Sequence, residues 1–336
     1  MVITTVPVHY LKAILASARR NGCDTQALLN TADIAVELLD SPKARIPVES
    51  FTLFVKAVRY ELQDEQLGFM GSPSRPGTFA MMGYACIHCP TLGQYLSRSI
   101  EFYQTLIGNY EMPITVEDDL ACIKFLPRSE QVDPSHFAPQ TSMSLVHRIS
   151  CWLIGQNLNL HSVSLTHARP EHAHDYNMLF RAPIQFDQPF DALYFSSRYL
   201  SAPNIQDESS LEALLELPSL QLMSLPDYKN SLADKIRVMI KQDVEAQFPE
   251  LEPIAEELGL SSATLRRRLR SEGTTYQIIK DDIRRDAAIY HLGRGVMSIE
   301  QVAAKIGFIE VTSFYRAFKR WTGVTPRDYI KKTPVE

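Results

Sequence analysis

Two short runs near the end of the chain combine cations with regularly spaced apolar residues. In LRRRLR, Leu265 and Leu269 lie four residues apart, and in FYRAFKR, Phe314 and Phe318 have the same spacing. On a helix this spacing turns the apolar pair towards a core and leaves the cations outside, where they can donate hydrogen bonds to phosphate oxygens or base edges. The cations are Arg266, Arg267, Arg268 and Arg270 in the first run, and Arg316, Lys319 and Arg320 in the second.

Both runs belong to a longer internal repeat. LEPIAEELGLSSATLRRRL begins at Leu251 and IEQVAAKIGFIEVTSFYRAF begins at Ile299, so that Gly259 in one copy matches Gly307 in the other. In each copy the apolar spacing predicts a helix, the glycine permits a sharp turn, and the cationic run forms a second helix. One copy alone could be an ordinary helical hairpin with solvated arginines. Two copies favour a pair of helix-turn-helix units.

The ends of the cationic helices carry residues suited to those positions. Ser261 is placed to cap the first of them through its hydroxyl group. Glu310 lies near the start of the second, where the helix dipole favours negative charge. Between the two copies, Ile279, Ile283 and Ala287 predict an amphipathic helix that also includes Tyr290. That helix would hold the two units about one DNA turn apart.

Charge is distributed unevenly along the chain. Residues 231–336 contain 18 Lys and Arg against 15 Asp and Glu, whereas the preceding residues contain 16 against 24. An acidic first part and a basic last part suggest that the last part faces nucleic acid. The five cysteines are too few and too scattered for a disulfide framework, and no apolar stretch is long enough to cross a membrane. We therefore expect a cytoplasmic protein.

A possible metal site at Cys86-Ile-His-Cys89 is a weaker signal. The residue types are right for zinc, but a structural zinc site takes about four ligands, usually as two separated pairs. No second pair with cysteine spacing accompanies this one; the remaining candidates are His161, His167, His172 and His174. We expect no metal and no cofactor.

The first two hundred residues mix helical and strand-like patterns. Residues 112–116 and 120–125 alternate as two strands joined by an acidic turn at 117–119. Further strands are expected at 163–166, 184–186 and 192–195, and helices at 1–20, 51–62, 96–107, 143–152 and 171–180. Residues 207–227 are leucine-rich and acidic, as in a connector that can include a short helix. From about residue 230 the whole pattern is helical.

The patterns predict an α+β N-terminal domain followed by an all-α DNA-binding domain with two helix-turn-helix motifs. We place the first domain at residues 1–204, a linker at 205–229 and the DNA-binding domain at 230–336.

Residues 230–332 resemble the DNA-binding domain of the AraC/XylS family of transcription regulators. The stretch IEQVAAKIGF and the later SFYRAFKRWTGVTPRDYI match the family signature almost throughout. The resemblance implies base-edge contacts by Ala263, Arg266 and Arg267 in the first unit and by Val311, Thr312, Ser313, Tyr315 and Arg316 in the second. We add Ser261, Arg270 and Lys319 as further DNA contacts. Ile309 departs from the small polar residue usual in the family, which puts the capping of the second cationic helix in question.

The N-terminal part also resembles one branch of that family. The runs LLDSPKARIPVESF, TFAMMGYACIHCPTLGQYL and LTHARPEHAHDYNMLFRAPIQFDQPFDALYF are similar to the arabinose-binding-like effector domain found in ornithine-utilisation regulators. The resemblance implies that residues 1–204 form the effector and dimerisation domain and that a small metabolite controls DNA binding. Candidate walls for its pocket are Phe79, Met82, Tyr84, Phe102 and Tyr103, although their residue types favour an ordinary core role for each one.

The resemblance implies an activator, and three expected partners follow from it: a double-stranded DNA operator, a small-molecule effector and RNA polymerase. Apolar residues of the connector and the N-terminal domain that we expect to be exposed predict a homodimer. The alternative is a DNA-binding domain fused to an unrecognised enzyme. We expect no catalytic residues, because the sequence contains neither a glycine-rich phosphate loop nor a G-x-S-x-G nucleophile turn. A protein that only packages DNA would not need a large acidic domain with its own core.

Overall fold

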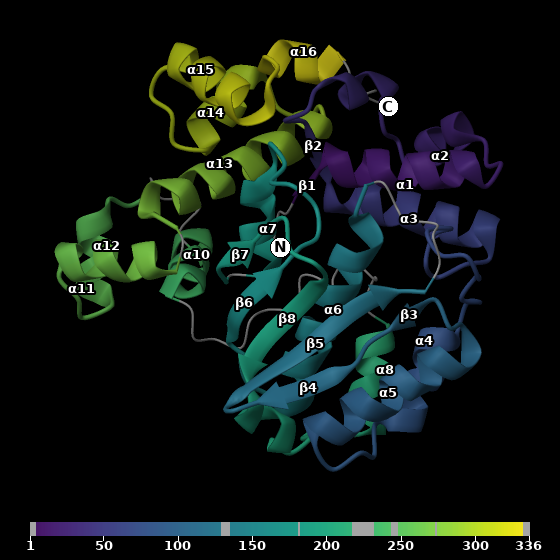
Figure 1. The fold of residues 1–336 in the computed structure, drawn as a ribbon. Coiled ribbons are helices and arrows are strands. Elements are labelled where there is room, and N and C mark those ends of the chain that lie inside the picture. The colour runs from purple at the N-terminus through teal and green to yellow at the C-terminus, as the bar shows by residue number, and fades with distance from the viewer. Residues whose placement is uncertain are drawn as a thin grey trace. The chain divides into compact units, whose positions relative to one another are not determined.

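A computed structural model describes residues 5–128, 135–180, 182–216, 232–242, 248–272 and 274–331. The chain forms two compact units (Figure 1). Unit 1 contains residues 1–58 and 229–336, and unit 2 contains residues 59–228. No helix within these described ranges is both long enough and apolar enough to cross a membrane.

Unit 2 is built on a six-stranded sheet with the order β3-β5-β8-β6-β7, and β4 also pairs with β5. The pairs β4·β5, β5·β8 and β6·β8 are antiparallel, whereas β6 and β7 run parallel. The strands are β3 (Tyr110–Glu111), β4 (Ile114–Glu117), β5 (Leu120–Pro127), β6 (Leu160–Ser164), β7 (Ile184–Gln185) and β8 (Asp191–Ser196). The helices are α4 (Thr78–Cys86), α5 (Leu92–Leu106), α6 (Phe137–Ile154), α7 (Ala173–Phe180), η2 (Ser197–Ser201) and α8 (Glu208–Leu215).

The predicted hairpin is confirmed: β4 and β5 pair around a turn in which Asp118 adopts a left-handed backbone with φ 52°. The expected helices and strands of this region are present. Helices α5 and α6 begin earlier than expected, at Leu92 and Phe137, and the strand bounds differ from the expected ones by up to three residues. Strand β3, helix α4 and the short helix η2 were not predicted. Helices and strands together confirm the α+β class expected for the N-terminal part.

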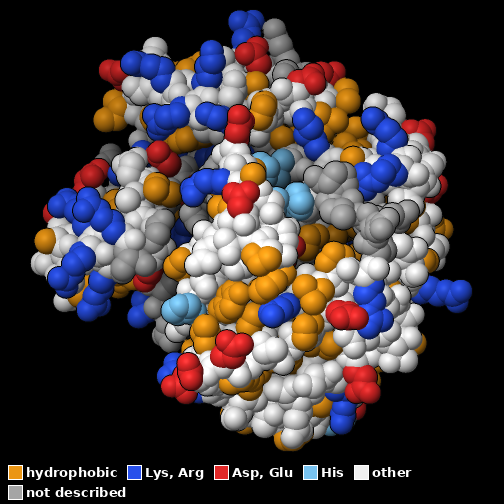
Figure 2. Space-filling model, viewed as in Figure 1, with side chains coloured by type: hydrophobic (Ala, Val, Ile, Leu, Met, Phe, Trp, Pro, Cys, Tyr) orange, Lys and Arg blue, Asp and Glu red, His pale blue; other side chains and the backbone are white. Residues whose placement is uncertain are grey.

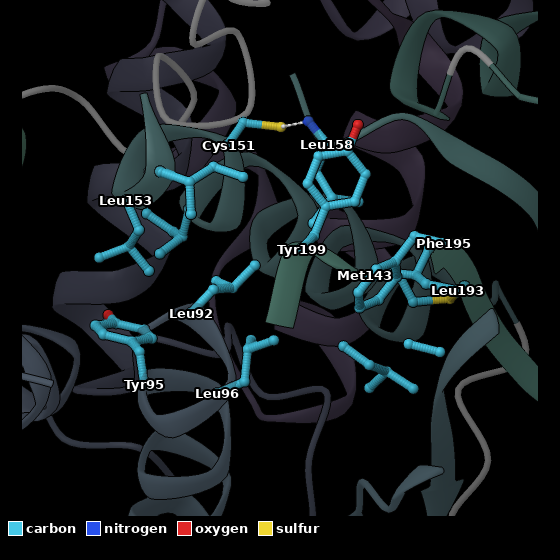
Figure 3. Close-up of a cluster of buried hydrophobic side chains, with 14 of the residues drawn as sticks. Leu92, Tyr95, Leu96, Met143, Cys151, Leu153, Leu158, Leu193, Phe195 and Tyr199 are labelled. Atoms are coloured by element: carbon cyan, nitrogen blue, oxygen red, sulfur yellow. Dashed lines mark hydrogen bonds between the residues drawn. The ribbon is translucent and has the colours of Figure 1, made fainter. Parts of the chain in front are cut away.

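The core of unit 2 lies between the sheet and its helices (Figure 3). The side chains meeting there are Leu92, Tyr95 and Leu96 from α5, Met143, Cys151 and Leu153 from α6, Leu193 and Phe195 from β8, and Tyr199 from η2. The core also contains a polar contact: the Leu158 N–H donates a hydrogen bond to Cys151 Sγ at 3.3 Å. Burial of so many apolar side chains is the main stabilising contribution to this unit.

Unit 1 is helical apart from a two-stranded antiparallel sheet of β1 (Thr5–Pro7) and β2 (Arg45–Pro47). Its first helices are α1 (Val8–Arg20), α2 (Thr25–Thr31), η1 (Val36–Asp40) and α3 (Val48–Leu62). Its later helices are α10 (Leu232–Gln242), α11 (Leu251–Glu257), α12 (Ser262–Ser271), α13 (Tyr276–Gly293), α14 (Ile299–Lys305), α15 (Val311–Thr322) and α16 (Pro326–Lys331). The all-α C-terminal region with two helix-turn-helix motifs is confirmed by this order of elements. The helix expected over residues 1–20 begins at Val8, because residues 5–7 form strand β1.

Residues 5–58 pack against the C-terminal helices through buried polar contacts. The Arg45 side chain, 5 % exposed, donates from Nε to Thr5 Oγ1 at 2.8 Å, and Thr5 Oγ1 donates to Asp286 Oδ1 of α13 at 2.6 Å. The Tyr329 hydroxyl of α16 donates to the Arg45 carbonyl at 3.2 Å. Ser41 Oγ donates to the Thr322 carbonyl at the end of α15 at 3.0 Å. We refer to residues 5–47 below as the N-terminal segment.

These units divide the chain differently from the expected domains. Residues 1–58 were assigned to the effector domain, but their buried hydrogen bonds hold them to the C-terminal helices. Part of the expected linker is also packed. Leu211 and Leu214 of α8 are buried, and α8 contacts α4. Residues 217–229 of that linker lie outside the described residues.

Candidate nucleic-acid interface

The first helix-turn-helix unit consists of α11 and α12. Gly259 adopts φ 65° at the turn, and the Leu260 N–H donates to the Ala255 carbonyl at 2.8 Å, which closes the end of α11. Ser261 Oγ accepts the Thr264 N–H at 3.2 Å, so the predicted cap is present. Leu265 and Leu269 are fully buried. The turn and the buried face therefore follow the sequence prediction.

The second unit, α14 and α15, repeats the same backbone arrangement. Gly307 adopts φ 78°, and the Phe308 N–H donates to the Ala303 carbonyl at 2.9 Å, the contact that Leu260 makes in the first copy. Phe314 and Phe318 are fully buried. Glu310 occupies the N-cap position of α15 without a side-chain hydrogen bond to the helix. The unusual Ile309 is fully exposed, so neither residue caps α15 through its side chain.

All eleven predicted DNA-contact residues are accessible in the structure. Ser261, Ala263, Arg266, Arg267 and Arg270 on or beside α12 are exposed, as are Thr312, Arg316 and Lys319 on α15; Val311, Ser313 and Tyr315 are partly exposed. In Figure 2 the Lys and Arg side chains gather over α12 and over α15. Each helix thus presents its cations on the face opposite its buried pair, as a groove-reading helix requires.

Two ion pairs involve cations of these helices, and one of these cations, Arg266, is a predicted DNA contact. Arg266 lies 3.5 Å from Glu252, and Arg320 lies 3.2 Å from Asp281. Exposed pairs of this kind contribute little to stability, so phosphate can replace the carboxylate at low cost. Within the described ranges, no carboxylate is paired with Arg267 or Arg316.

Helix α13 joins the two helix-turn-helix units (Figure 1). Ile279, Ile283 and Ala287 are buried as predicted, and Tyr290 is partly exposed. The sequence analysis missed Arg284 on the same helix. Its guanidinium carbon lies 4.7 Å from the ring centroid of Phe248 and 4.9 Å from that of Phe308, and Nη2 donates to the Gly307 carbonyl at 3.2 Å.

The Arg284 guanidinium of α13 therefore stabilises the turn at Gly307 between α14 and α15. Burial lowers the pKa of Arg284 from its ordinary value, although the group stays charged at neutral pH. No periodicity signals such a residue, because a surface arginine on an amphipathic helix has the same spacing.

The five candidate effector residues lie on or beside the core of unit 2. Met82 is buried, and Tyr95 donates its hydroxyl hydrogen to Met82 Sδ at 3.6 Å. The other four are partly buried and pack against that core: Phe79 and Tyr84 from α4, and Phe102 and Tyr103 from α5. Burial raises the pKa of Tyr103, so its hydroxyl remains protonated. Their grouping on α4 and α5 agrees with a packing role for each side chain.

A separate cavity of about 270 Å³ opens at the end of the sheet where β5 finishes and β8 begins. None of the five candidate residues lines this cavity within the part of unit 2 that the structure describes. Its lining residues are Phe69, Met70, Gly71, Asn109, Tyr110, Phe125, Leu126, Pro127, His136, Pro139, Thr166, Pro189, Phe190 and Asp191. One signal in the sequence could have indicated it: Asp191 opens the apolar strand DALYF with a charge at an inward position.

The two cysteines of the Cys86-Ile-His-Cys89 run are buried, whereas His88 is exposed and bonds Glu208 at 2.9 Å. Burial raises the pKa of Cys86 to about 11, so its thiol is protonated at neutral pH and is a poor metal ligand. Among the described residues, no three His, Cys, Asp or Glu side chains are grouped to hold a metal ion. The run instead contributes thiols to the packing of α4 and α5.

Comparison with family models finds matches to both halves of the chain. Residues 22–204 match the arabinose-binding domain of AraC transcription regulators, N-terminal, and residues 254–332 match a helix-turn-helix domain. The second match spans both helix-turn-helix units described above. The first spans all six strands of the unit 2 sheet and also α2, η1 and β2, which belong to unit 1, whereas α1 ends before the match begins.

Several relatives are similar to the chain. The ornithine utilization regulator of Pseudomonas aeruginosa is 30% identical over 96% of this chain and 96% of its own. An uncharacterized transcriptional regulator of Mycobacterium tuberculosis is 24% identical over 97% and 96%. The virulence regulon transcriptional activator VirF of Shigella flexneri is 33% identical over 30% of this chain and 37% of its own. Among solved structures, the regulator CdpR of P. aeruginosa has a TM-score of 0.34 at 21% identity, covering 84% of this chain and 91% of that one.

The match to the N-terminal family model covers more than half of the chain, and the ornithine utilization regulator matches it almost end to end. These similarities agree with the repeated helix-turn-helix geometry of α11–α12 and α14–α15. The chain belongs to the AraC family of transcription regulators, with an N-terminal ligand-binding domain and a helix-turn-helix DNA-binding domain.

Proposed function

We propose that α12 and α15 enter successive segments of the major groove of one operator and read base edges there. The observation that carries this proposal is the repeat itself: two units with the same turn hydrogen bond, each with its cations exposed and its apolar pair buried. The 18 residues of α13 span about 27 Å at the rise of an α-helix. Neighbouring major-groove segments on one face of DNA lie about 34 Å apart, which two helices supported by α13 can reach.

The proposed base contacts are the eight residues predicted to reach base edges, and Ser261, Arg270 and Lys319 are proposed as further DNA contacts. Arg267 and Arg316 should contribute most, because no carboxylate among the described residues pairs with either guanidinium. The experiment first selects bound sequences from random duplexes with the full-length chain. It then measures the affinity of Arg267→Ala and Arg316→Ala for the selected operator and for a scrambled duplex across a salt series. We expect each variant to lose about 1–3 kcal/mol on the operator and to relax preference at base pairs in its own half.

A matched control is Lys235→Ala, which removes an exposed cation from α10, outside both reading helices. It should leave the base preference unchanged. If Arg267→Ala loses the same affinity on both duplexes, then α12 grips only the phosphate backbone and the proposed reading is wrong.

The regulatory part of the proposal assigns the effector response to unit 2. A small metabolite bound there changes the affinity for the operator, and by linkage the operator changes the affinity for the metabolite by the same factor. We propose that the protein activates transcription through RNA polymerase, acts in the cytoplasm and binds DNA as a homodimer. The relative named as an activator supports the sign of regulation. Sedimentation with and without operator DNA measures the dimer, and a strict monomer in both conditions would contradict it.

The same proposal assigns no catalytic step to unit 2. Since the whole-length relative is named as a regulator, metabolite binding without turnover is expected. Incubating the full-length chain with a metabolite that raises its melting temperature, and then recovering that metabolite unchanged, tests this point.

A further inference from the structure

The cavity at the end of the sheet is built around a pair of residues that face the same side. Phe125 of β5 and Asp191 of β8 are directly opposite each other in the antiparallel ladder, so their side chains project from the same face. Both line the cavity. Its volume of about 270 Å³ corresponds to the space of roughly nine water molecules in the liquid, enough for a small organic molecule.

Asp191 places a buried carboxylate at this cavity. The residue is 7 % exposed, and its Oδ1 accepts the Thr166 N–H at 2.7 Å. Among the residues that the structure describes, no Lys, Arg or His side chain is paired with Asp191. The nearby Lys124 instead has its Nζ 4.5 Å from the ring centroid of Phe190. Burial of a carboxylate costs free energy unless a cation or further hydrogen-bond donors contact it. The second carboxylate oxygen of Asp191 is therefore suited to a cation from outside the chain.

The walls of the cavity suit the same kind of ligand. Aromatic rings line it at Phe69, Tyr110, Phe125 and Phe190. The face of an aromatic ring carries negative charge density and attracts an ammonium group, while the ring also provides apolar contact for the rest of the ligand.

A stacked pair of histidines forms part of the cavity wall. His136 lines the cavity and stacks on His167 with ring centroids 4.5 Å apart. His167 Nε2 accepts a hydrogen bond from Gln140 Nε2 at 3.1 Å, and its Nδ1–H donates to the Ala168 carbonyl at 2.8 Å. Both ring nitrogens of His167 are thus engaged by Gln140 and Ala168, and His136 is the histidine that faces the cavity.

We propose that this cavity is the effector site and that its ligand is a small molecule with a primary ammonium group on a compact apolar body. The ammonium group donates to the free oxygen of Asp191, and the apolar body lies against the aromatic rings. This inference rests on the proposed function, in which unit 2 carries the effector response.

The experiment titrates the full-length protein by calorimetry with three probes of similar size: benzylamine, benzyl alcohol and benzoate. They differ in the charge of one group, which is positive, absent or negative at neutral pH. Benzylamine should bind tightest. Asp191→Asn keeps an acceptor oxygen for the Thr166 N–H but removes the charge, so it should weaken benzylamine binding at least about tenfold.

Asp187→Asn is the matched control. Asp187 is an exposed carboxylate four residues earlier with φ 56°, a conformation that asparagine also adopts readily. This variant should bind benzylamine as the unaltered chain does. Circular dichroism and the melting temperature of each variant, measured without probe, identify any loss of fold separately from loss of binding.

Three outcomes overturn the inference. Benzoate or benzyl alcohol can bind as well as benzylamine, benzylamine can bind Asp191→Asn undiminished, or none of the probes can bind at millimolar concentration. Operator affinity is measured on the same preparations. Intact operator binding together with any of these outcomes rejects the ammonium site alone, whereas loss of sequence-specific binding by the unaltered chain rejects the proposed function.

Discussion

The two helix-turn-helix units share one backbone geometry and are stabilised by different means. The first has small anchors, Leu265 and Leu269, and a serine cap at the start of its reading helix. The second has no side-chain cap but a cluster of rings: Phe314 lies 5.6 Å from Phe318 and 5.7 Å from Phe308 between ring centroids, and Phe318 lies 5.6 Å from Tyr329. The same backbone geometry is thus stabilised by a hydrogen bond at a helix end in the first helix-turn-helix unit and by aromatic packing in the second.

Their surroundings differ as well. A Cβ atom added at Gly259 would meet nothing within 4 Å, whereas one at Gly307 would lie 3.1 Å from the Phe248 ring and 3.2 Å from Arg284. The N-terminal segment contacts α15 through Ser41 and the neighbouring α16 through Arg45. The second helix-turn-helix unit is therefore more enclosed than the first. From this comparison we infer that α12 can change its position more easily than α15.

The largest difference is expected when an anchor is removed. Phe318→Ala should lower the free energy of unfolding of unit 1 by about 3–5 kcal/mol, because Phe318 is fully buried and its ring contacts Phe314 and Tyr329. Leu269→Ala should cost less, about 2–3 kcal/mol, because its side chain is smaller. Urea unfolding followed by Trp321 fluorescence, in a Trp152→Phe background, reports on unit 1 alone. Equal costs for the two variants would contradict the comparison.

The next effect concerns the N-terminal segment. Arg45→Ala removes a buried cation that bonds Thr5 and lies near the carboxylates of α13, so it should destabilise unit 1 by about 3 kcal/mol. Hydrogen exchange should accelerate more in α15 and α16 than in α12. Arg20→Ala, which removes an exposed cation of α1, is the control and should change neither pattern. Equal acceleration of hydrogen exchange in all helices of unit 1 would show that the N-terminal segment does not stabilise the second helix-turn-helix unit more than the first.

The smallest effect should come from the helix caps. Ser261→Ala removes the bond to the Thr264 N–H and should cost about 1 kcal/mol. Glu310→Ser should stabilise by up to about 1 kcal/mol, because Glu310 already has the extended backbone of an N-cap, with φ −109° and ψ 126°. Thermal unfolding of unit 1 measures both changes. The comparison fails if the two substitutions shift the melting temperature in the same direction.

The features that the sequence predicted are those encoded within a few residues. The apolar spacing of Leu265 and Leu269, the glycine at each turn and the acidic turn before Leu120 all act locally, so the repeat and the β4–β5 hairpin were predictable. The packing of the N-terminal segment was not. Thr5 and Asp286 are 281 residues apart in the sequence, and no periodicity records that their side chains meet.

The reading residues and the cavity differ in the same way. Cations opposite a buried face of a helix must be exposed, and the structure leaves all eleven predicted contacts accessible. A cavity forms instead where packing is incomplete, and apolar spacing cannot distinguish a cavity wall from a core residue. The aromatic residues chosen on α4 and α5 show this, since they pack on the core while the cavity lies at the ends of β5 and β8.

The position of the N-terminal segment also has a consequence for protein synthesis. Residues 5–47 leave the ribosome before the helices that they contact, which follow on the order of tens of seconds later at ordinary rates of translation. All residues of unit 2 have been synthesised before the C-terminal helices of unit 1 can pack against the N-terminal segment. A chain released early lacks α15 and α16, and the buried Arg45 side chain then has no Tyr329 beside it. The packing of residues 5–47 on α15 and α16 thus waits until both helices have been synthesised, and a shorter chain has only the first of the two proposed reading helices.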